Sequence, residues 1–253
     1  MTKLSNIKIA VWVFYSVILS LSRLGYAQTY LFNRADFPIG TYPTGIAVAD
    51  FNRDGNLDLV LGDTQEGSVS ILLGKNDGTF AKRIIYSGFN PGAVASGDFN
   101  RDGKPDVAVT NWSSNTVSIL LGNGNGTFQS AMNFSTSLQP SQIVVADFNR
   151  DGKLDVAVSH NAGTSVSVLL GNGDGTLRGY VDYVVPSGSI GIVAADFNRD
   201  GKLDLAAADT WANAVCVLLG NGDGTFQPST SVPAGQVPVA LAVGDVNGDG
   251  SWT

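Results

Sequence analysis

The sequence predicts an all-β fold, a β-propeller of four-stranded blades, from three observations. An acidic nine-residue pattern, D-x-N-x-D-G-x-x-D, is repeated along the chain, and its copies begin at Asp50, Asp98, Asp147, Asp196 and Asp245. The copies are 48 or 49 residues apart, a period typical of stacked supersecondary units. Glycine is abundant, with 31 residues, and short apolar runs are separated by turn residues.

Each repeat reads as four short strands. In the second copy the apolar runs are 92–99, 107–109, 117–121 and 128–134. The glycine-rich turn at 122–126 supplies the positive φ angles that hairpins need, and it recurs at 74–78, 171–175 and 220–224. A four-stranded antiparallel sheet in each repeat of about 50 residues is typical of a propeller blade. A β-solenoid is the alternative, but its coils use shorter periods.

The two ends of the array carry incomplete repeats. Residues 32–38 match the register of a fourth strand, and residues 239–245 match a first strand. We therefore expect four complete repeats plus partial first and last blades. This arrangement predicts an incomplete propeller or a fragment of a longer array, because a ring with an unfinished blade leaves open sheet edges. The alternative is a small four-bladed ring with loose tails.

Residues 1–27 have the features of a secretory signal peptide. Lys3 and Lys8 precede an apolar stretch at 9–21, which is too short to span a bilayer comfortably, and small residues lead to a cleavage site after Ala27. Arg23 favours the alternative of an uncleaved anchor. We expect a secreted or cell-surface protein whose residues 28–253 form the propeller and do not insert into a membrane.

The charge and the cysteine content limit the possible partners. The formal net charge is −7, and loss of the three basic residues of the signal peptide would leave −10. Four bound divalent cations would bring this close to neutrality. An acidic chain is a poor partner for nucleic acid or an anionic membrane. Cys216 is the only cysteine, so no intrachain disulfide can fasten the loops.

The acidic pattern predicts a calcium site in each complete copy, about four sites with an incomplete fifth. Oxygen ligands at positions 1, 3, 5 and 9 can surround a hard cation, and position 7 would contribute its backbone carbonyl while its side chain points to water. Magnesium resists an all-protein cage, and zinc would need histidine or cysteine. Ordinary Asp-rich turns are the alternative, but clustered carboxylates repel one another without a cation. The predicted ligands are Asp50, Asn52, Asp54, Asn56, Asp58, Asp98, Asn100, Asp102, Lys104, Asp106, Asp147, Asn149, Asp151, Lys153, Asp155, Asp196, Asn198, Asp200, Lys202, Asp204, Asp245, Asn247 and Asp249.

These motifs resemble the FG-GAP/VCBS-type repeat family, whose best-known members are the integrin alpha-chain propellers. The matching strings are ADFNRDGNLDLVL, GDFNRDGKPDVAV, ADFNRDGKLDVAV and ADFNRDGKLDLAA, each followed by a string similar to VSVLLGNGDGTF. The resemblance implies calcium in the loop that joins the first two strands of each blade. The chain departs from the family in two respects: integrin-like propellers usually have seven blades, and the fifth loop carries Thr253 at position 9.

The opposite face of the blades is the candidate ligand face. Strand alternation puts the loops between strands 2 and 3, and between successive blades, on the side away from the acidic loops. Trp112, Trp211 and His160 fall in or beside the 2–3 loops, and aromatic loop residues are good platforms for sugars or proteins. The alternative is that each tryptophan covers a neighbouring blade. His160 is expected to be a surface loop residue rather than a catalytic base.

These features favour a non-enzymatic, calcium-binding repeat module for protein or carbohydrate binding and adhesion. The alternative is the accessory propeller of a secreted carbohydrate-active enzyme, such as a polysaccharide lyase, and a third possibility is an architectural stalk. Fourteen of the 21 aspartates lie in the acidic loops, which leaves few for acid–base chemistry. The sequence has no HExxH motif, phosphate loop or Ser-His-Asp order.

Overall fold

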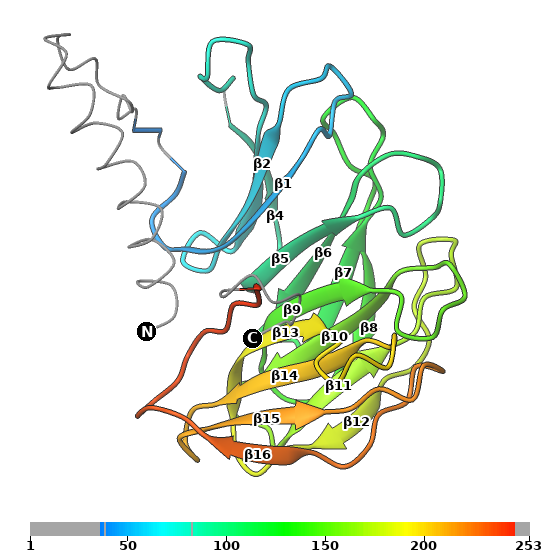
Figure 1. The fold of residues 1–253 in the computed structure, drawn as a ribbon. Coiled ribbons are helices and arrows are strands. Elements are labelled where there is room, and N and C mark those ends of the chain that lie inside the picture. Colours follow the sequence, from blue (N-terminus) through cyan, green and yellow to red (C-terminus); the bar gives the residue numbers. More distant parts are fainter. Residues whose placement is uncertain (1–35, 38, 82, 246–253) are drawn as a thin grey trace, which may run out of the picture.

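The chain forms four antiparallel sheets stacked in sequence order, as the repeat period predicts (Figure 1). The computed structural model describes residues 36, 37, 39–81 and 83–245. The predicted signal peptide and the predicted ligands Asn247 and Asp249 therefore lie outside the described residues. Within the described ranges the fold is all-β, and no helix there could cross a bilayer. The four sheets form an open array, which confirms the incomplete propeller of four-stranded blades.

We call the sheets blades 1 to 4, and each blade keeps its strands in chain order. Blade 1 contains β1 (Pro43–Ala49), β2 (Asp58–Asp63), β3 (Ser68–Leu72) and β4 (Ile84–Ser87). Blade 2 contains β5 (Pro91–Gly97), β6 (Asp106–Asn111), β7 (Thr116–Leu120) and β8 (Met132–Ser135). Blade 3 contains β9 (Pro140–Ala146), β10 (Asp155–His160), β11 (Ser165–Leu169) and β12 (Val181–Val184). Blade 4 contains β13 (Ser189–Ala195), β14 (Asp204–Asp209), β15 (Ala214–Leu218) and β16 (Thr230–Pro233).

The fourth strand of each blade is shorter than the sequence predicts. In blade 2 the apolar run 128–134 forms one isolated bridge, between Gly122 and Phe128, before β8 begins at Met132. The same bridge closes the turn in the other three blades. The run is interrupted because its first residue closes the hairpin, whereas the later residues pair with β7.

The hydrophobic core lies between successive blades rather than within one sheet. Val60 and Ile71 of blade 1 pack with Val107 and Phe128 of blade 2, and two further clusters join blades 2 to 3 and 3 to 4. The first strands β1, β5, β9 and β13 lie against one another in turn. A single sheet therefore buries its apolar faces only by stacking on its neighbours.

The segment before β1 packs against blade 1 as the fourth strand of a preceding blade would. Phe37 packs edge-on against Phe80, with ring centroids 5.1 Å apart. Tyr183 of β12 makes the corresponding contact with Phe226 of blade 4 at 5.3 Å, and both Phe37 and Tyr183 precede the next acidic loop by 13 residues. This contact agrees with the register predicted for residues 32–38, of which only 36 and 37 are described.

The segment after β16 packs beside blade 4 as the first strand of a following blade would. Thr210 Oγ1 donates to the carbonyl of Pro238 at 2.8 Å, just as Thr64 Oγ1 of blade 1 donates to Pro91 of β5 at 2.7 Å. A Cβ atom on Gly191 would lie 3.0 Å from Ala240 Cα, so the two backbones are in close contact. No strand is assigned in the described part of this segment.

Candidate functional site

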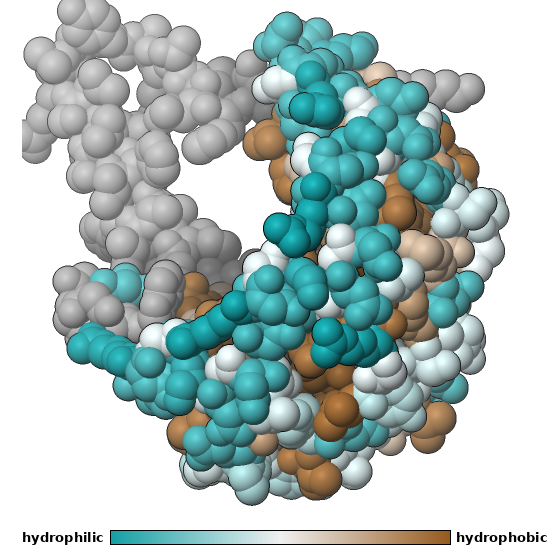
Figure 2. Space-filling view, turned by 90° about the vertical axis from the view of Figure 1, so that its right-hand side faces the viewer, coloured by the Kyte–Doolittle hydropathy of each residue, from teal (hydrophilic) through white to brown (hydrophobic). Residues whose placement is uncertain are grey.

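The acidic loops lie at one end of the blades, where each joins a first strand to a second strand. Figure 2 views this end of the molecule, whose surface is largely hydrophilic with some apolar patches. In blade 1, Asp50 accepts hydrogen bonds from the backbone N–H groups of Asp54 (3.0 Å) and Gly55 (2.8 Å). Asn52 Oδ1 accepts from the same Asp54 N–H at 3.0 Å. Side-chain oxygens of positions 1 and 3 therefore converge on one point, and the other three complete loops repeat this geometry.

Two residues in each loop adopt left-handed backbone conformations. The arginine at position 4 has φ between 60° and 63°, and the glycine at position 6 has φ between 77° and 88°. A Cβ atom on Gly55, Gly103 or Gly152 would meet nothing within 4 Å. Glycine is thus required at position 6 by its φ angle and not by lack of space.

The aspartate at position 9 is a buried anchor, a role that the sequence did not predict. Asp58, Asp106, Asp155 and Asp204 are all fully buried. In blade 1, Asp58 Oδ2 accepts from Phe51 N–H and Oδ1 accepts from Gly74 N–H, both at 2.8 Å, which ties the loop to the turn between β3 and β4. Burial raises the pKa of the Asp58, Asp106 and Asp155 carboxyls, against the effect of these N–H donors. Asp58 Oδ2 also accepts from Asn52 N–H at 3.3 Å, so in blade 1 only Oδ1 keeps a second lone pair, and a metal role for position 9 stays a prediction.

The lysine at position 7 keeps a partly exposed side chain, and its ammonium group lies against the aspartate at position 5. Lys104 Nζ lies 2.9 Å from Asp102 Oδ2, and the corresponding distances in blades 3 and 4 are both 3.2 Å. The hydrogen bond from Lys104 lowers the pKa of Asp102. In blade 1 the residue is Asn56, whose Nδ2 donates to Asp54 Oδ1 at 2.9 Å. The ammonium groups thus neutralise part of the loop charge in three of the four blades.

The donor chemistry of each loop fits a hard cation. Among the residues that the structure describes, no group of three His, Cys, Asp or Glu side chains is arranged to hold a metal. Each complete loop nevertheless offers a half-buried carboxylate at position 1, an exposed carboxylate at position 5, an asparagine oxygen and the backbone carbonyl of position 7, all oxygen donors of the kind that calcium prefers. Of the fifth loop, only Asp245 is described.

Each of the first three acidic loops also contacts the following blade. The carbonyl of Phe51, at position 2 of the first loop, accepts from Gly126 N–H in the turn between β7 and β8 at 3.0 Å. Blades 2 to 3 and 3 to 4 repeat this bond, at 3.0 and 3.2 Å. The Arg150 side chain donates to the carbonyl of Gly201 in the next loop. The loops therefore join the blades as well as closing their hairpins.

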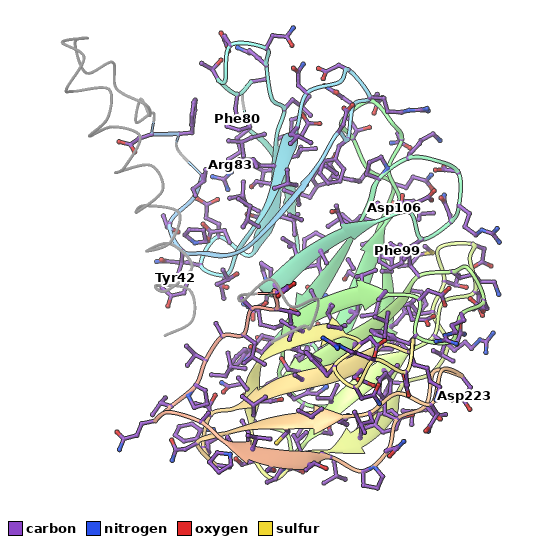
Figure 3. The ribbon with its side chains drawn as sticks, viewed as in Figure 1. Tyr42, Phe80, Arg83, Phe99, Asp106 and Asp223 are labelled. Atoms are coloured by element: carbon purple, nitrogen blue, oxygen red, sulfur yellow. The ribbon has the colours of Figure 1, made fainter. Side chains whose placement is uncertain are left out.

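The opposite end of blades 1 and 2 contains a cavity of about 500 Å³. Figure 3 shows Tyr42 at this end of the sheets, away from Asp106 and Asp223. Trp112, predicted as a ligand-face residue, lines this cavity, whereas Trp211 and His160 do not. Trp211 is 69% exposed in the 2–3 loop of blade 4. The lining residues are Tyr42, Thr44, Thr64, Asn90, Pro91, Gly92, Trp112, Ser113 and Ser141.

His160 is fully buried at the end of β10, so the prediction of a surface loop residue is wrong. Its Nδ1 lies 3.1 Å from the carbonyl of Leu138, and its Nε2 lies 2.7 Å from Ser167 Oγ. Ser167 Oγ is also 2.5 Å from Asp182 Oδ1. The single hydroxyl hydrogen of Ser167 can be donated either to His160 or to Asp182, but not to both at once. Burial lowers the pKa of His160, against the charge of Asp182 and the Leu138 carbonyl.

His160 belongs to a series of loop-organising residues that sequence reasoning missed. Asp63, Asn111 and Asp209 occupy the same position, the last of the second strand, and all are buried. Asp63 accepts from the N–H groups of Tyr42 (3.0 Å) and Glu66 (2.8 Å), which lie in the two loops at this end of blade 1. The signal in the sequence is a polar residue 13 positions after the first Asp of every complete loop.

Solved structures of propeller-like proteins are similar to this fold. A lectin from Agrocybe aegerita, solved to explain recognition of non-reducing terminal N-acetylglucosamine, is 24% identical with a TM-score of 0.52, over 73% of this chain and 50% of that chain. BBS1N in complex with ARL6DN is 15% identical with a TM-score of 0.57, over 81% and 61%. A Lactobacillus plantarum protein is 14% identical with a TM-score of 0.55, over 80% and 58%. The chain thus spans about half to three fifths of these structures.

The comparison with curated protein sequences found no match. The family model of the FG-GAP-like repeat matches four times, at residues 50–109, 98–158, 157–207 and 196–251. These matches cover the four acidic loops and the sheets built around them. The chain therefore belongs to the FG-GAP-like repeat family.

Proposed function

We propose that this protein is a secreted binding module, stabilised by calcium in its acidic loops, that recognises a carbohydrate or protein on the face of the 2–3 loops. The observation that carries the proposal is the cavity between blades 1 and 2. Pockets of 300–1,000 Å³ with apolar walls and a few polar groups are typical binding sites. The cavity, with its aromatic and hydroxyl side chains, fits this description.

Two further observations support a binding role rather than an enzymatic one. The buried His160 is engaged by Leu138 and Ser167 and lies outside the cavity, so it is a poor candidate for a catalytic base. No ionisable carboxylate, histidine or lysine is among the residues that line the cavity. One of the similar structures is a lectin that recognises N-acetylglucosamine, and this similarity supports carbohydrate as the ligand class.

Calcium is assigned a structural role in this proposal. The acidic loops and the cavity lie at opposite ends of the blades, so a loop-bound ion would not contact a ligand in the cavity. The ion would neutralise the carboxylates and hold the loops that join successive blades.

The test is binding of the full chain to a glycan array and to a panel of purified extracellular proteins, each with calcium or with EDTA. We expect at least one specific ligand, bound more weakly in EDTA because the blades loosen. Absence of any specific ligand on both surfaces in calcium would contradict the proposed function.

A further inference from the structure

The cavity between blades 1 and 2 is chemically different from the equivalent clefts of the array. Two lining residues of this cavity can be compared with their repeat counterparts: one lies eight residues before an acidic loop, and the other lies 14 residues after the start of the following loop. At the first cleft these positions hold Tyr42 and Trp112. The counterparts of this pair in the following repeats are Asn90 with Asn161, and Gln139 with Thr210, and Asn90 itself also lines the first cavity. An aromatic pair therefore occurs at one cleft only among the described blades.

The polar groups of the cavity present both donors and acceptors. Thr44 Oγ1 and Thr64 Oγ1 each donate to the carbonyl of Pro91, at 2.8 and 2.7 Å, and lie 3.2 Å from each other, so toward a ligand these hydroxyl groups can only accept. Asn90 Oδ1 accepts from Ser113 Oγ at 2.9 Å, which leaves its Nδ2 to donate. Trp112 adds an indole N–H, a donor only.

The cavity has no charged side chain to pair with an ionic ligand. Asp63 lies nearby but is fully buried, and both its oxygens accept backbone N–H groups. An anion or a cation entering the cavity would lose hydration without gaining a counter-charge. The ligand that fits is neutral, rich in hydroxyl groups, and has an apolar ring face for Tyr42 and Trp112.

We infer that the cleft between blades 1 and 2 is a single saccharide site that binds one neutral pyranose residue against Tyr42 and Trp112. This inference rests on the proposed function and specifies its ligand and stoichiometry. The repeats alone would give several equivalent sites, whereas the lining residues give one.

The experiment combines a glycan array with isothermal titration of the best neutral saccharide into the full chain. We expect one molecule bound per chain. Trp112→Ala should weaken binding at least tenfold, Tyr42→Phe should keep it within about threefold, and Trp211→Ala is the matched control that should keep it within about twofold. Thermal denaturation in calcium shows whether each variant is folded.

A second readout places the ligand without relying on the Ala variant. In a protein whose other tryptophans, Trp12, Trp211 and Trp252, are replaced by phenylalanine, saturation with the saccharide should change the fluorescence of Trp112. An unchanged spectrum at saturation, equal affinity for the folded Trp112→Ala variant, or several sites per chain would each overturn the inference. A protein ligand whose binding survives Trp112→Ala, with no saccharide bound, would overturn it while leaving the proposed function intact.

Discussion

His160 and Asp209 occupy the same position in neighbouring blades and organise the surrounding loops with opposite hydrogen-bonding chemistry. Asp209 accepts from the N–H groups of Ser187 (3.0 Å) and Ala212 (3.1 Å). His160 instead faces the carbonyl of Leu138, which requires a donor at Nδ1. The residue type at this position therefore decides whether a blade turns N–H groups or a carbonyl toward its strand end.

Lowering the pH should destabilise the protein through His160. Because burial lowers the pKa of His160 in the folded state, the unfolded chain binds a proton first as the pH falls below about 6.5. Stability is thus lost from about pH 7 downward, until the folded-state pKa is passed. Thermal denaturation at pH 7, 6 and 5 should show a smaller loss for His160→Asn, which copies Asn111 of blade 2. Parallel curves for the two proteins would contradict this assignment.

Asp155→Asn should destabilise the protein even when no metal is present. The Asp155 carboxylate accepts from Phe148 N–H and Gly171 N–H, at 2.9 and 2.8 Å. In the asparagine variant the side-chain NH2 group would face one of these two backbone N–H groups, so that two donors would meet without an acceptor. The cost of one unpaired buried donor is about 1–3 kcal/mol. Urea denaturation in EDTA measures it, with the exposed Asp151→Asn as the matched control. An equal and small effect of both variants would contradict the anchoring role of Asp155.

At the level of strands and turns, the glycine turn between the third and fourth strands joins one blade to the previous one. Gly175 N–H donates to the carbonyl of Phe99, and a Cβ atom on Gly175 would lie 2.8 Å from Leu121 Cδ2. Gly78 is the equivalent residue of blade 1. It has a similar φ, 77° against 88°, but a Cβ atom there would meet nothing within 4 Å.

This difference allows the contact between blades to be measured by a matched pair. Gly78→Ala and Gly175→Ala share the strain of alanine at positive φ, but only Gly175→Ala crowds a neighbouring blade. We expect Gly175→Ala to lose about 1 kcal/mol more stability than Gly78→Ala, the lower end of the cost of overpacking. Urea denaturation of both variants gives the difference. Equal losses would mean that Leu121 moves aside without cost.

The sequence predicted the strands and their order because the signals for both are local. Turn glycines, the acidic loops and the short apolar runs repeat at fixed spacing, so each hairpin is specified by its own residues. The anchoring role of Asp58, the Lys104–Asp102 contact and the burial of His160 depend on which atoms are brought together after folding. The cavity could not be predicted from local signals, because Tyr42 and Trp112 belong to different blades and meet only when the blades stack.

For the molecule as a whole, stability is divided between the blades and the contacts that join them, as in other repeat proteins. The hydrophobic clusters lie between blades, and the acidic loops add a backbone hydrogen bond at each of the three junctions. Phe51, Phe99 and Phe148 of these loops are buried and pack in the hydrophobic clusters that join each blade to the next. Ordering of one loop is therefore expected to stabilise two blades at once.

Removal of calcium should lower the melting temperature of the whole array in one step. Calcium at 100 times the Kd of a site adds about 2.7 kcal/mol to the free energy of unfolding. Because the loops are hydrogen-bonded to the adjoining blade, loss of order in one loop also destabilises that blade. Calorimetry in millimolar calcium and in excess EDTA measures the shift, with magnesium as the control ion. Titration of the metal-stripped protein should give about one calcium per complete loop. Identical melting curves in calcium and EDTA would show instead that the lysines at position 7 and the backbone N–H groups neutralise the loops without a metal ion.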